Sequence, residues 1–352
     1  MSIASEIEDL NTNLTAAKNA VTTAGGTVGD TGLAGLAAEI ASIPSGGGGS
    51  WGTITFLENG ESVTVNISSL EEFAQLGASD ATATSNIYIG GYTFKRQTVK
   101  GVTVGDKADS TPRYFLKACT ALTSVTLPDT VSHIGAYFLY GCTSFNYPLV
   151  FPASLTFVDM YFLQGCTSFN QPITFPSTVT SIGKGMLSGC SSFNQSIVLP
   201  EGITTLSNGL LTNCSSFNQS FTIPSTVTFI DGSFMQNCAA FNQTITLPSS
   251  LTTIGNSFLS GCTSFNKNIS IPSSIESIGT SFLYNAKNMV STVDVGNVSD
   301  TKIASDNYTF ATNDNTALMY TTGIKLTGST AQDWKNKFPN RTSSPYRKLI
   351  VV

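Results

Sequence analysis

Hydrophobic residues recur along this chain every 24 residues, separated mainly by Ser, Thr, Asn, Gln and Gly. A phenylalanine series contains Phe145, Phe169, Phe193, Phe217, Phe241 and Phe265. Three further series of aliphatic or aromatic residues run through Ile134, Phe138 and Leu149 with the same spacing. A fixed period of this length indicates stacked copies of one supersecondary unit. Because one copy cannot bury its apolar face alone, neighbouring copies must cover it. The pattern therefore predicts a solenoid.

Within each unit, apolar and polar residues alternate over two short stretches. In Ile173-Thr174-Phe175 the alternation predicts a strand with one face buried and the other in solvent. Pro176 ends this strand, because proline cannot donate a hydrogen bond to a neighbouring strand. A second short strand is expected over residues 178–182. The segment before each cysteine is expected to form a tight helical or 3₁₀ turn, so the fold is mostly β.

All seven cysteines occupy one position of the repeat. Equivalent residues in adjacent turns should lie about 4.8 Å apart, whereas a disulfide needs Cβ atoms about 3.8 Å apart. No second Cys or His accompanies them at a metal-ligand spacing. We therefore expect a ladder of buried free thiols and no metal site. The ladder consists of Cys119, Cys142, Cys166, Cys190, Cys214, Cys238 and Cys262.

An asparagine follows each phenylalanine of the ladder that starts at Phe145. The first turn lacks it and is one residue shorter, which indicates that the asparagine enters later turns as a bulge. One interpretation is a structural ladder bonded to the next turn's backbone, and the other is a ligand-binding row. These residues are Asn146, Asn170, Asn194, Asn218, Asn242 and Asn266. The adjacent glutamines are candidate surface contacts, namely Gln171, Gln195, Gln219 and Gln243.

These units resemble the BspA-like leucine-rich repeat. The shared features are an apolar residue before proline, Ile-Gly as in Ile182-Gly183 and Gly-Cys as in Gly141-Cys142, over residues 102–290. The resemblance implies a leucine-rich-repeat-type solenoid of about seven 24-residue turns. It also implies a non-catalytic scaffold for surface adhesion and recognition. The Phe-Asn-Gln stretch departs from the family pattern, so surface details are not carried over.

Residues 1–45 follow a different pattern, in which apolar residues lie three and four apart. This heptad spacing predicts helices that form a short coiled coil or an intramolecular hairpin. The stripe consists of Ile3, Ile7, Leu10, Leu14, Ala17 and Val21. Residues 46–50 are Gly-rich and predict a flexible linker. The helical segment is similar to short N-terminal modules of tailed-bacteriophage structural proteins (tail, baseplate or head decoration), which implies an anchor for other virion proteins.

Small α/β caps are expected at both ends of the solenoid, where an open edge would otherwise invite aggregation. In residues 51–101, Asn59-Gly60 between two alternating stretches predicts a β-hairpin, and Ser69 precedes a short helix. Residues 291–352 contain the pattern strand, short helix, strand over 323–326, 331–338 and 348–352.

Composition limits the partners. Charged residues make up 11% of the 352 residues and the net charge is -5. No basic cluster stands out, so nucleic acid is not an expected partner. No apolar run is long enough for a membrane-spanning helix, and the N-terminus lacks the pattern of a signal peptide. We therefore predict neither membrane insertion nor signal-dependent secretion.

No catalytic constellation is recognisable. His133 is the single histidine and occupies a variable, outward position of the repeat, with no Ser or Cys partner in register. The glycines at 46–49 lack the lysine and the strand–helix context of a phosphate-binding loop. The sequence therefore predicts that the protein is not an enzyme and needs no cofactor.

Outward aromatic residues gather in the early turns. Tyr137 and Tyr161 are equivalent positions, at which later turns carry Gly or Ser. Nearby by register lie Tyr140, Tyr147, His133 and Phe157. Aromatic rings among Ser, Thr, Asn and Gln are suited to stacking on sugar rings. The alternative is that they pack beneath residues 51–101 or against a neighbouring subunit.

Together these features predict a bacteriophage virion protein that assembles in the host cytoplasm. Its N-terminus would join other virion proteins, and its solenoid would recognise a host-surface glycan or protein. A homo-oligomer is expected, with a trimer as one option. Two alternatives stay open, a purely architectural decoration or spacer protein and a bacterial cell-surface BspA-like adhesin.

Overall fold

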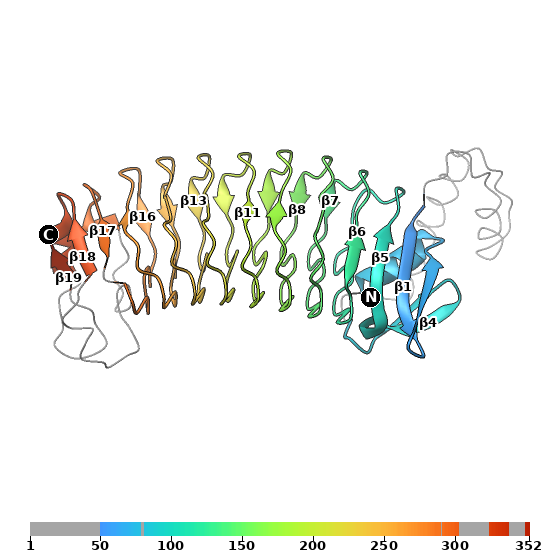
Figure 1. Cartoon of the computed structure of the whole chain (residues 1–352). Helices are drawn as coiled ribbons and strands as arrows, with labels where there is room; N and C mark the ends of the chain where they lie inside the picture. Colours follow the sequence, from blue (N-terminus) through green and yellow to red (C-terminus); the bar gives the residue numbers. More distant parts are fainter. Residues whose placement is uncertain (1–49, 79–80, 290, 303–323, 338–348) are drawn as a thin grey trace, which may run out of the picture. The chain divides into compact units, whose positions relative to one another are not determined.

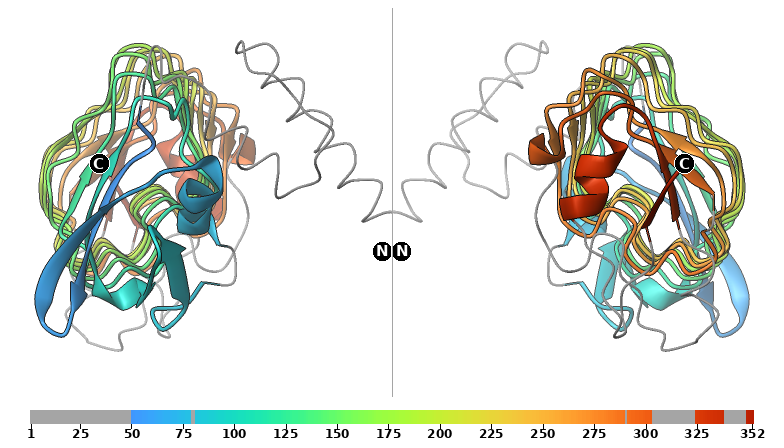
Figure 2. Two further views of the ribbon diagram at one scale, coloured as in Figure 1. Left: turned by 90° about the vertical axis from the view of Figure 1, so that its right-hand side faces the viewer. Right: turned by 90° about the vertical axis from the view of Figure 1, so that its left-hand side faces the viewer.

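A computed structural model describes residues 50–78, 81–289, 291–302, 324–337 and 349–352. The predicted helical module at 1–45, with its stripe from Ile3 to Val21, lies outside the described residues. The unit Ser50–Val352 is mostly β, and its turns stack side by side along one axis (Figure 1). Viewed along that axis, the turns superimpose in one cross-section (Figure 2). The predicted solenoid is confirmed.

Two parallel ladders of short strands run along the solenoid. In each, a strand pairs with its equivalent in the next turn, as Ile182 does with Val158. The first ladder contains β5 (Val99–Val104), β6 (Ser124–Thr126), β9 (Ile173–Thr174), β11 (Ile197–Val198), β15 (Ile269–Ser270) and β17 (Thr292–Asp294). The second contains β7 (His133–Ile134), β8 (Phe157–Val158), β10 (Ser181–Ile182), β12 (Thr205–Leu206), β13 (Phe229–Ile230), β14 (Thr253–Ile254) and β16 (Ser277–Ile278).

The segment before each cysteine is neither helical nor 3₁₀, so that expectation was wrong. Tyr137, Leu139 and Gly141 all have positive φ, at 61°, 55° and 71°. This alternation directs every second N–H towards a neighbouring turn. Tyr137 N donates to Met160 O at 2.8 Å, whereas Leu139 N donates to Phe115 O at 2.9 Å. A helix would instead satisfy these groups within the segment and leave the turns unconnected.

The interior is a column of side chains that repeat from turn to turn. Rings of the phenylalanine ladder stack with centroids 5.7 to 6.0 Å apart, and their planes differ by 6° or less. Phe193 and its equivalents are fully buried. Burying a side chain of this size stabilises the fold by roughly 1.5–3 kcal/mol. The stack is therefore a main source of cohesion between turns.

The seven cysteines are free and buried within this column. From Cys142 onward each thiol donates to a main-chain carbonyl of the preceding turn, as Cys190 Sγ does to Leu163 O at 3.1 Å. Burial raises the pKa of the Cys119 and Cys238 thiols to about 12. The thiols are thus neutral spacers, each with a hydrogen-bond partner for its S–H.

The solenoid has about nine turns, two more than the count of cysteines indicated. The additional turns lack the cysteine. Ala286 takes its place and is fully buried, and Val293 and Leu326 continue the first ladder as fully buried residues. A marker residue therefore undercounts the ends of a solenoid, where the neighbour is a cap and not another repeat.

The N-terminal cap continues the first ladder. Strands β1 (Gly52–Glu58) and β2 (Glu61–Asn66) form the predicted hairpin around Asn59-Gly60, both with positive φ. Strand β1 also pairs antiparallel with β5, which pairs parallel with β6 of the first turn. The cap further contains α3 (Leu70–Ala74), η1 (Gln75–Gly77), β3 (Asn86–Ile89), β4 (Tyr92–Lys95) and η2 (Arg96–Thr98).

Arg96 joins this cap to the solenoid. Its guanidinium is fully buried and donates to the carbonyls of Leu76, at 3.3 Å, and Lys117, at 3.2 Å. It also donates to Gln75 O, at the C-terminal end of η1's first turn, where a cation is favoured by the helix dipole. The carbonyls of cap and first turn are thereby satisfied by one side chain.

The C-terminal cap extends the same ladder at the other end. Strands β17, β18 (Ile324–Thr327) and β19 (Leu349–Val351) pair in parallel, and η3 (Asp300–Lys302) and α4 (Ala331–Lys337) flank them. Trp334 of α4 is fully buried and donates from Nε1 to Val298 O at 2.9 Å. The predicted order of strand, helix and strand is confirmed for the described residues.

Candidate ligand-binding groove

One outward position of the repeat changes character along the solenoid. It precedes the buried Phe138 and its equivalents, and in every turn its φ lies between 56° and 68°. The early turns carry tyrosine here, whereas the later turns carry glycine or serine. In order, the residues are Tyr114, Tyr137, Tyr161, Gly185, Gly209, Ser233, Ser257 and Ser281. The backbone is therefore constant, and only the side chain differs.

The three tyrosines form a stack along the solenoid axis. The ring centroids of Tyr114 and Tyr137 lie 4.6 Å apart, and those of Tyr137 and Tyr161 lie 4.8 Å apart. Cations line this stack, with Arg113 5.2 Å from the Tyr114 centroid and Lys184 5.5 Å from that of Tyr161. Such cation–π contacts fix the rings at a partly exposed site.

A depression of about 390 Å³ begins where the stack ends. Tyr161 forms one wall, and Gly185 and Gly209 lie along its lining beside Asp231 and Gln236. A Cβ added to Gly185 would lie 2.6 Å from Tyr161 Cδ1. The missing side chains therefore leave room beside the Tyr161 ring.

A second depression of about 500 Å³ follows in the next turns. Ser257, Gly261 and Tyr284 line it, and Gln236 lines both depressions. Because they share this residue, they form one continuous feature from Tyr161 to Tyr284. We call it the polar groove.

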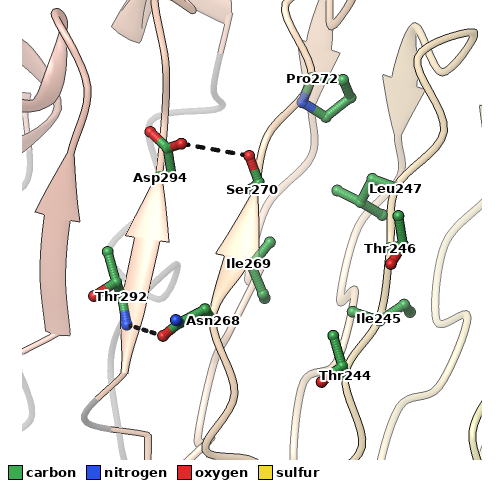
Figure 3. A pocket seen from close by; sticks show the side chains of 10 residues that line it. All are labelled: Thr244, Ile245, Thr246, Leu247, Asn268, Ile269, Ser270, Pro272, Thr292 and Asp294. Carbon is green, nitrogen blue, oxygen red and sulfur yellow. Dashed lines mark hydrogen bonds between the residues drawn. The ribbon is translucent and has the colours of Figure 1, made fainter.

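A third hollow, of about 510 Å³, lies on the first ladder (Figure 3). Here Asn268 Oδ1 accepts from Thr292 N at 3.0 Å, and Ser270 Oγ donates to Asp294 Oδ2 at 3.4 Å. These bonds join β15 to β17, whereas residues 244–247 are not paired with β15 in the described structure. The hollow is thus a separation between two turns and holds no aromatic side chain.

The aromatic residues predicted from the sequence fall into three groups. Tyr140 contacts Tyr137 edge-on at 5.7 Å and so extends the tyrosine stack. His133 and Phe157 make a separate edge-to-face pair at 4.7 Å on the second ladder. Tyr147 is 43% exposed, and no ring contact joins it to the stack within the described residues. The single aromatic surface that was predicted is therefore divided.

The asparagines form a hydrogen-bonded ladder. Asn194 Oδ1 accepts from Asn218 N at 2.9 Å, and the same contact recurs from Asn146 to Asn266. The glutamines partly belong to it, since Nε2 of Gln171, Gln219 and Gln243 donates to the asparagine of the preceding turn. Gln195 is half-buried beside them. These amides hold turns together, which makes them weaker candidates for ligand contacts.

Sequence reasoning missed Tyr114, the two glycines and the polar residues around them. Tyr114 lies five residues before Cys119, as Tyr137 does before Cys142, so its register was readable. The groove itself follows from absent side chains at Gly185 and Gly209, which a search for chemically active residues passes over.

The described residues contain no cluster of three or more His, Cys, Asp or Glu side chains with the proximity of a metal site. Nor do they include a helix with the length and apolarity that a membrane crossing requires. What the groove offers is hydrogen-bonding side chains and one aromatic wall on a rigid frame. These features define a solenoid repeat protein with a ligand-sized groove.

Comparison with known proteins gives its family. The model of the BspA type leucine rich repeat region matches residues 87–218 and 193–317. The two matches cover more than half of the chain, which therefore belongs to the BspA-type leucine-rich-repeat family. No curated protein matches it.

Solved structures share the fold. A leucine-rich repeat protein from Bacteroides ovatus aligns with a TM-score of 0.54 and 18% identity, over 85% of this chain and 75% of that one. A leucine rich cell surface protein from Faecalibacterium prausnitzii aligns with a TM-score of 0.31 and 16% identity, over 70% and 87%. The first likeness supports the leucine-rich-repeat fold, and at this identity it says nothing more.

Proposed function

We propose that this protein is a non-enzymatic recognition protein whose polar groove binds a ligand on a cell surface. The observation that carries the proposal is the groove from Tyr161 to Tyr284, which crosses several turns and is lined by hydrogen-bonding groups. Ligand sites combine a concave surface with a few directed polar groups, and both are present here. Membership of a surface-repeat family supports the same reading.

The proposed setting is a bacteriophage particle. The heptad stripe at residues 3–21 and the Gly-rich linker support an N-terminal anchor to other virion proteins, and a homo-oligomer held by that stripe. The solenoid would then face the host surface. Several copies on one particle would raise the avidity of a weak individual contact.

Competition tests this role. Purified full-length protein, added in excess to host cells, should reduce the adsorption of particles that carry it, because both occupy the same receptor. The matched control is the same protein with its groove blocked by Gly209→Tyr. Adsorption that is undiminished by the wild-type protein would contradict a recognition role and favour a spacer.

The alternative is a bacterial surface adhesin, which family membership supports equally. Antibody labelling separates the two, since a virion protein is found on purified particles and an adhesin on uninfected cells.

A further inference from the structure

The polar groove has two unlike ends. Towards the N-terminal cap it stops at the stack of Tyr114, Tyr137 and Tyr161, in which the rings fill the position that glycine leaves empty. In the other direction it continues past Gly185, Gly209 and small serines. The groove is therefore blocked at Tyr161 and extended away from it.

Its lining has little net charge. Lys184 and Asp231 are the two charged residues of the first depression, and their charges are opposite. Asn208 and Gln236 supply both donors and acceptors, as hydroxyl-rich ligands do. An ionic ligand gains nothing overall from such a lining, and an apolar peptide finds a single ring. The chemistry matches an uncharged polyhydroxylated chain.

The Tyr161 ring faces the empty side of the groove. Tyr137 covers it on one side at 4.8 Å, whereas the next turn has Gly185, whose missing Cβ would clash with the ring. The exposed ammonium of Lys184 lies beside it. A pyranose ring presents an apolar C–H face to stack on tyrosine and hydroxyls at its rim for Lys184 and Asn208.

The length of the groove suits a chain. From Tyr161 to Tyr284 it crosses five turn-to-turn steps, which at about 4.8 Å each gives roughly 24 Å. A sugar unit in an extended polysaccharide advances by a similar step, so that successive units meet successive turns.

From this geometry we propose that the groove binds the end of an uncharged polysaccharide, with the terminal sugar stacked on Tyr161. The inference rests on the proposed recognition function and specifies its ligand. The blocked end determines that a chain terminus, and not an internal segment, is bound. The rest of the chain extends towards Tyr284.

Binding of the full-length protein to arrayed oligosaccharides tests the ligand class. The probes are a length series of uncharged hexose and N-acetylhexosamine oligosaccharides, printed beside sialylated and uronate-containing chains. We expect uncharged chains to bind, with a signal that rises until the chain fills the groove. Preferential binding of the acidic chains, or of no glycan, would overturn the proposal.

Two variants place the site. Gly209→Tyr fills the groove at a backbone φ of 68°, close to the 63° of Tyr161, so this fold already holds tyrosine in that conformation. It should weaken binding at least about tenfold, or about 1.4 kcal/mol. Tyr161→Ala should have a similar effect, whereas Tyr147→Ala, outside the groove, should have none. Unchanged binding by folded Gly209→Tyr would refute the site.

Competition distinguishes chain ends from internal segments. Among chains long enough to fill the groove, the potency of an uncharged competitor at equal mass should follow its number of ends, so shorter chains compete better. Equal potency would contradict terminal recognition. Binding of the protein to intact host cells without binding to any glycan would leave the recognition function standing and remove this inference alone.

Discussion

The early and late turns of the solenoid have the same interior and different exteriors. Phe145 in an early turn and Phe241 in a late one are both fully buried, in the same stack. The outward position is Tyr137 in the first case and Ser233 in the second, with φ of 61° and 56°. The fold is therefore specified by the interior, and the outward position is free to carry binding chemistry. Four measurements can break or sharpen this comparison.

The largest contrast concerns the thiols. Burial holds the thiols neutral, so none of the seven cysteines should react with a thiol reagent at pH 8 until the protein unfolds, when all seven should react. A raised folded-state pKa stabilises the protein below the unfolded value of 9.0, and this is lost as pH rises towards about 12. Stability should therefore decline above pH 9. Rapid labelling of native protein would show that the interior is not sealed.

The next effect is that of the phenylalanine stack. Phe193→Ala should lower the free energy of unfolding by about 3–5 kcal/mol, because it removes contacts with both neighbouring turns and leaves a cavity. Denaturant unfolding measures it. Val198→Ala, at a position 51% exposed, is the matched surface control and should cost less than about 0.5 kcal/mol. Similar losses for both would contradict an interior-specified fold.

A smaller effect is expected from the asparagine ladder. Asn194→Ala leaves the N–H of Asn218 and the amide of Gln219 without their acceptor, which should cost about 1–3 kcal/mol. Gln219→Ala removes only the second bond and should cost less. If the two variants were equally stable, the ladder would have no structural role.

The smallest effect is that of the outward position itself. Tyr137→Ala removes two ring contacts and should cost about 0.5–1.5 kcal/mol, whereas Ser257→Ala should be close to neutral. Thermal unfolding of both variants measures the difference. A loss on the scale of Phe193→Ala would mean that the tyrosine stack belongs to the core.

Much of the fold was readable from the sequence, because each interior residue repeats its role at one spacing. The ladders of Ile182 and Cys190 were evident in this way, as was the hairpin at Asn59-Gly60. The path around Tyr137 was not, since L-residues with positive φ leave no signal in a hydrophobic pattern. Nor was the end of the solenoid, where Ala286 replaces the cysteine.

The candidate groove was readable only in part. Tyr161 was singled out as an outward aromatic residue, but Lys184 and Asp231 converge on it only once the turns are stacked. Tyr147 shares its repeat position with the glutamines and lies apart from the tyrosines, although it is close to them in sequence. Proximity along the chain and proximity in space differ in a structure whose neighbours lie 24 residues away.

The constant offset between bonded partners has an evolutionary corollary. Excision or duplication of one whole unit, for example residues 191–214, reconnects every ladder in register, because each contact spans the same number of residues. Any other change in length moves the downstream interior residues to the surface. The molecule is therefore a ruler graduated in single turns, and its reach can lengthen or shorten by recombination without a new fold.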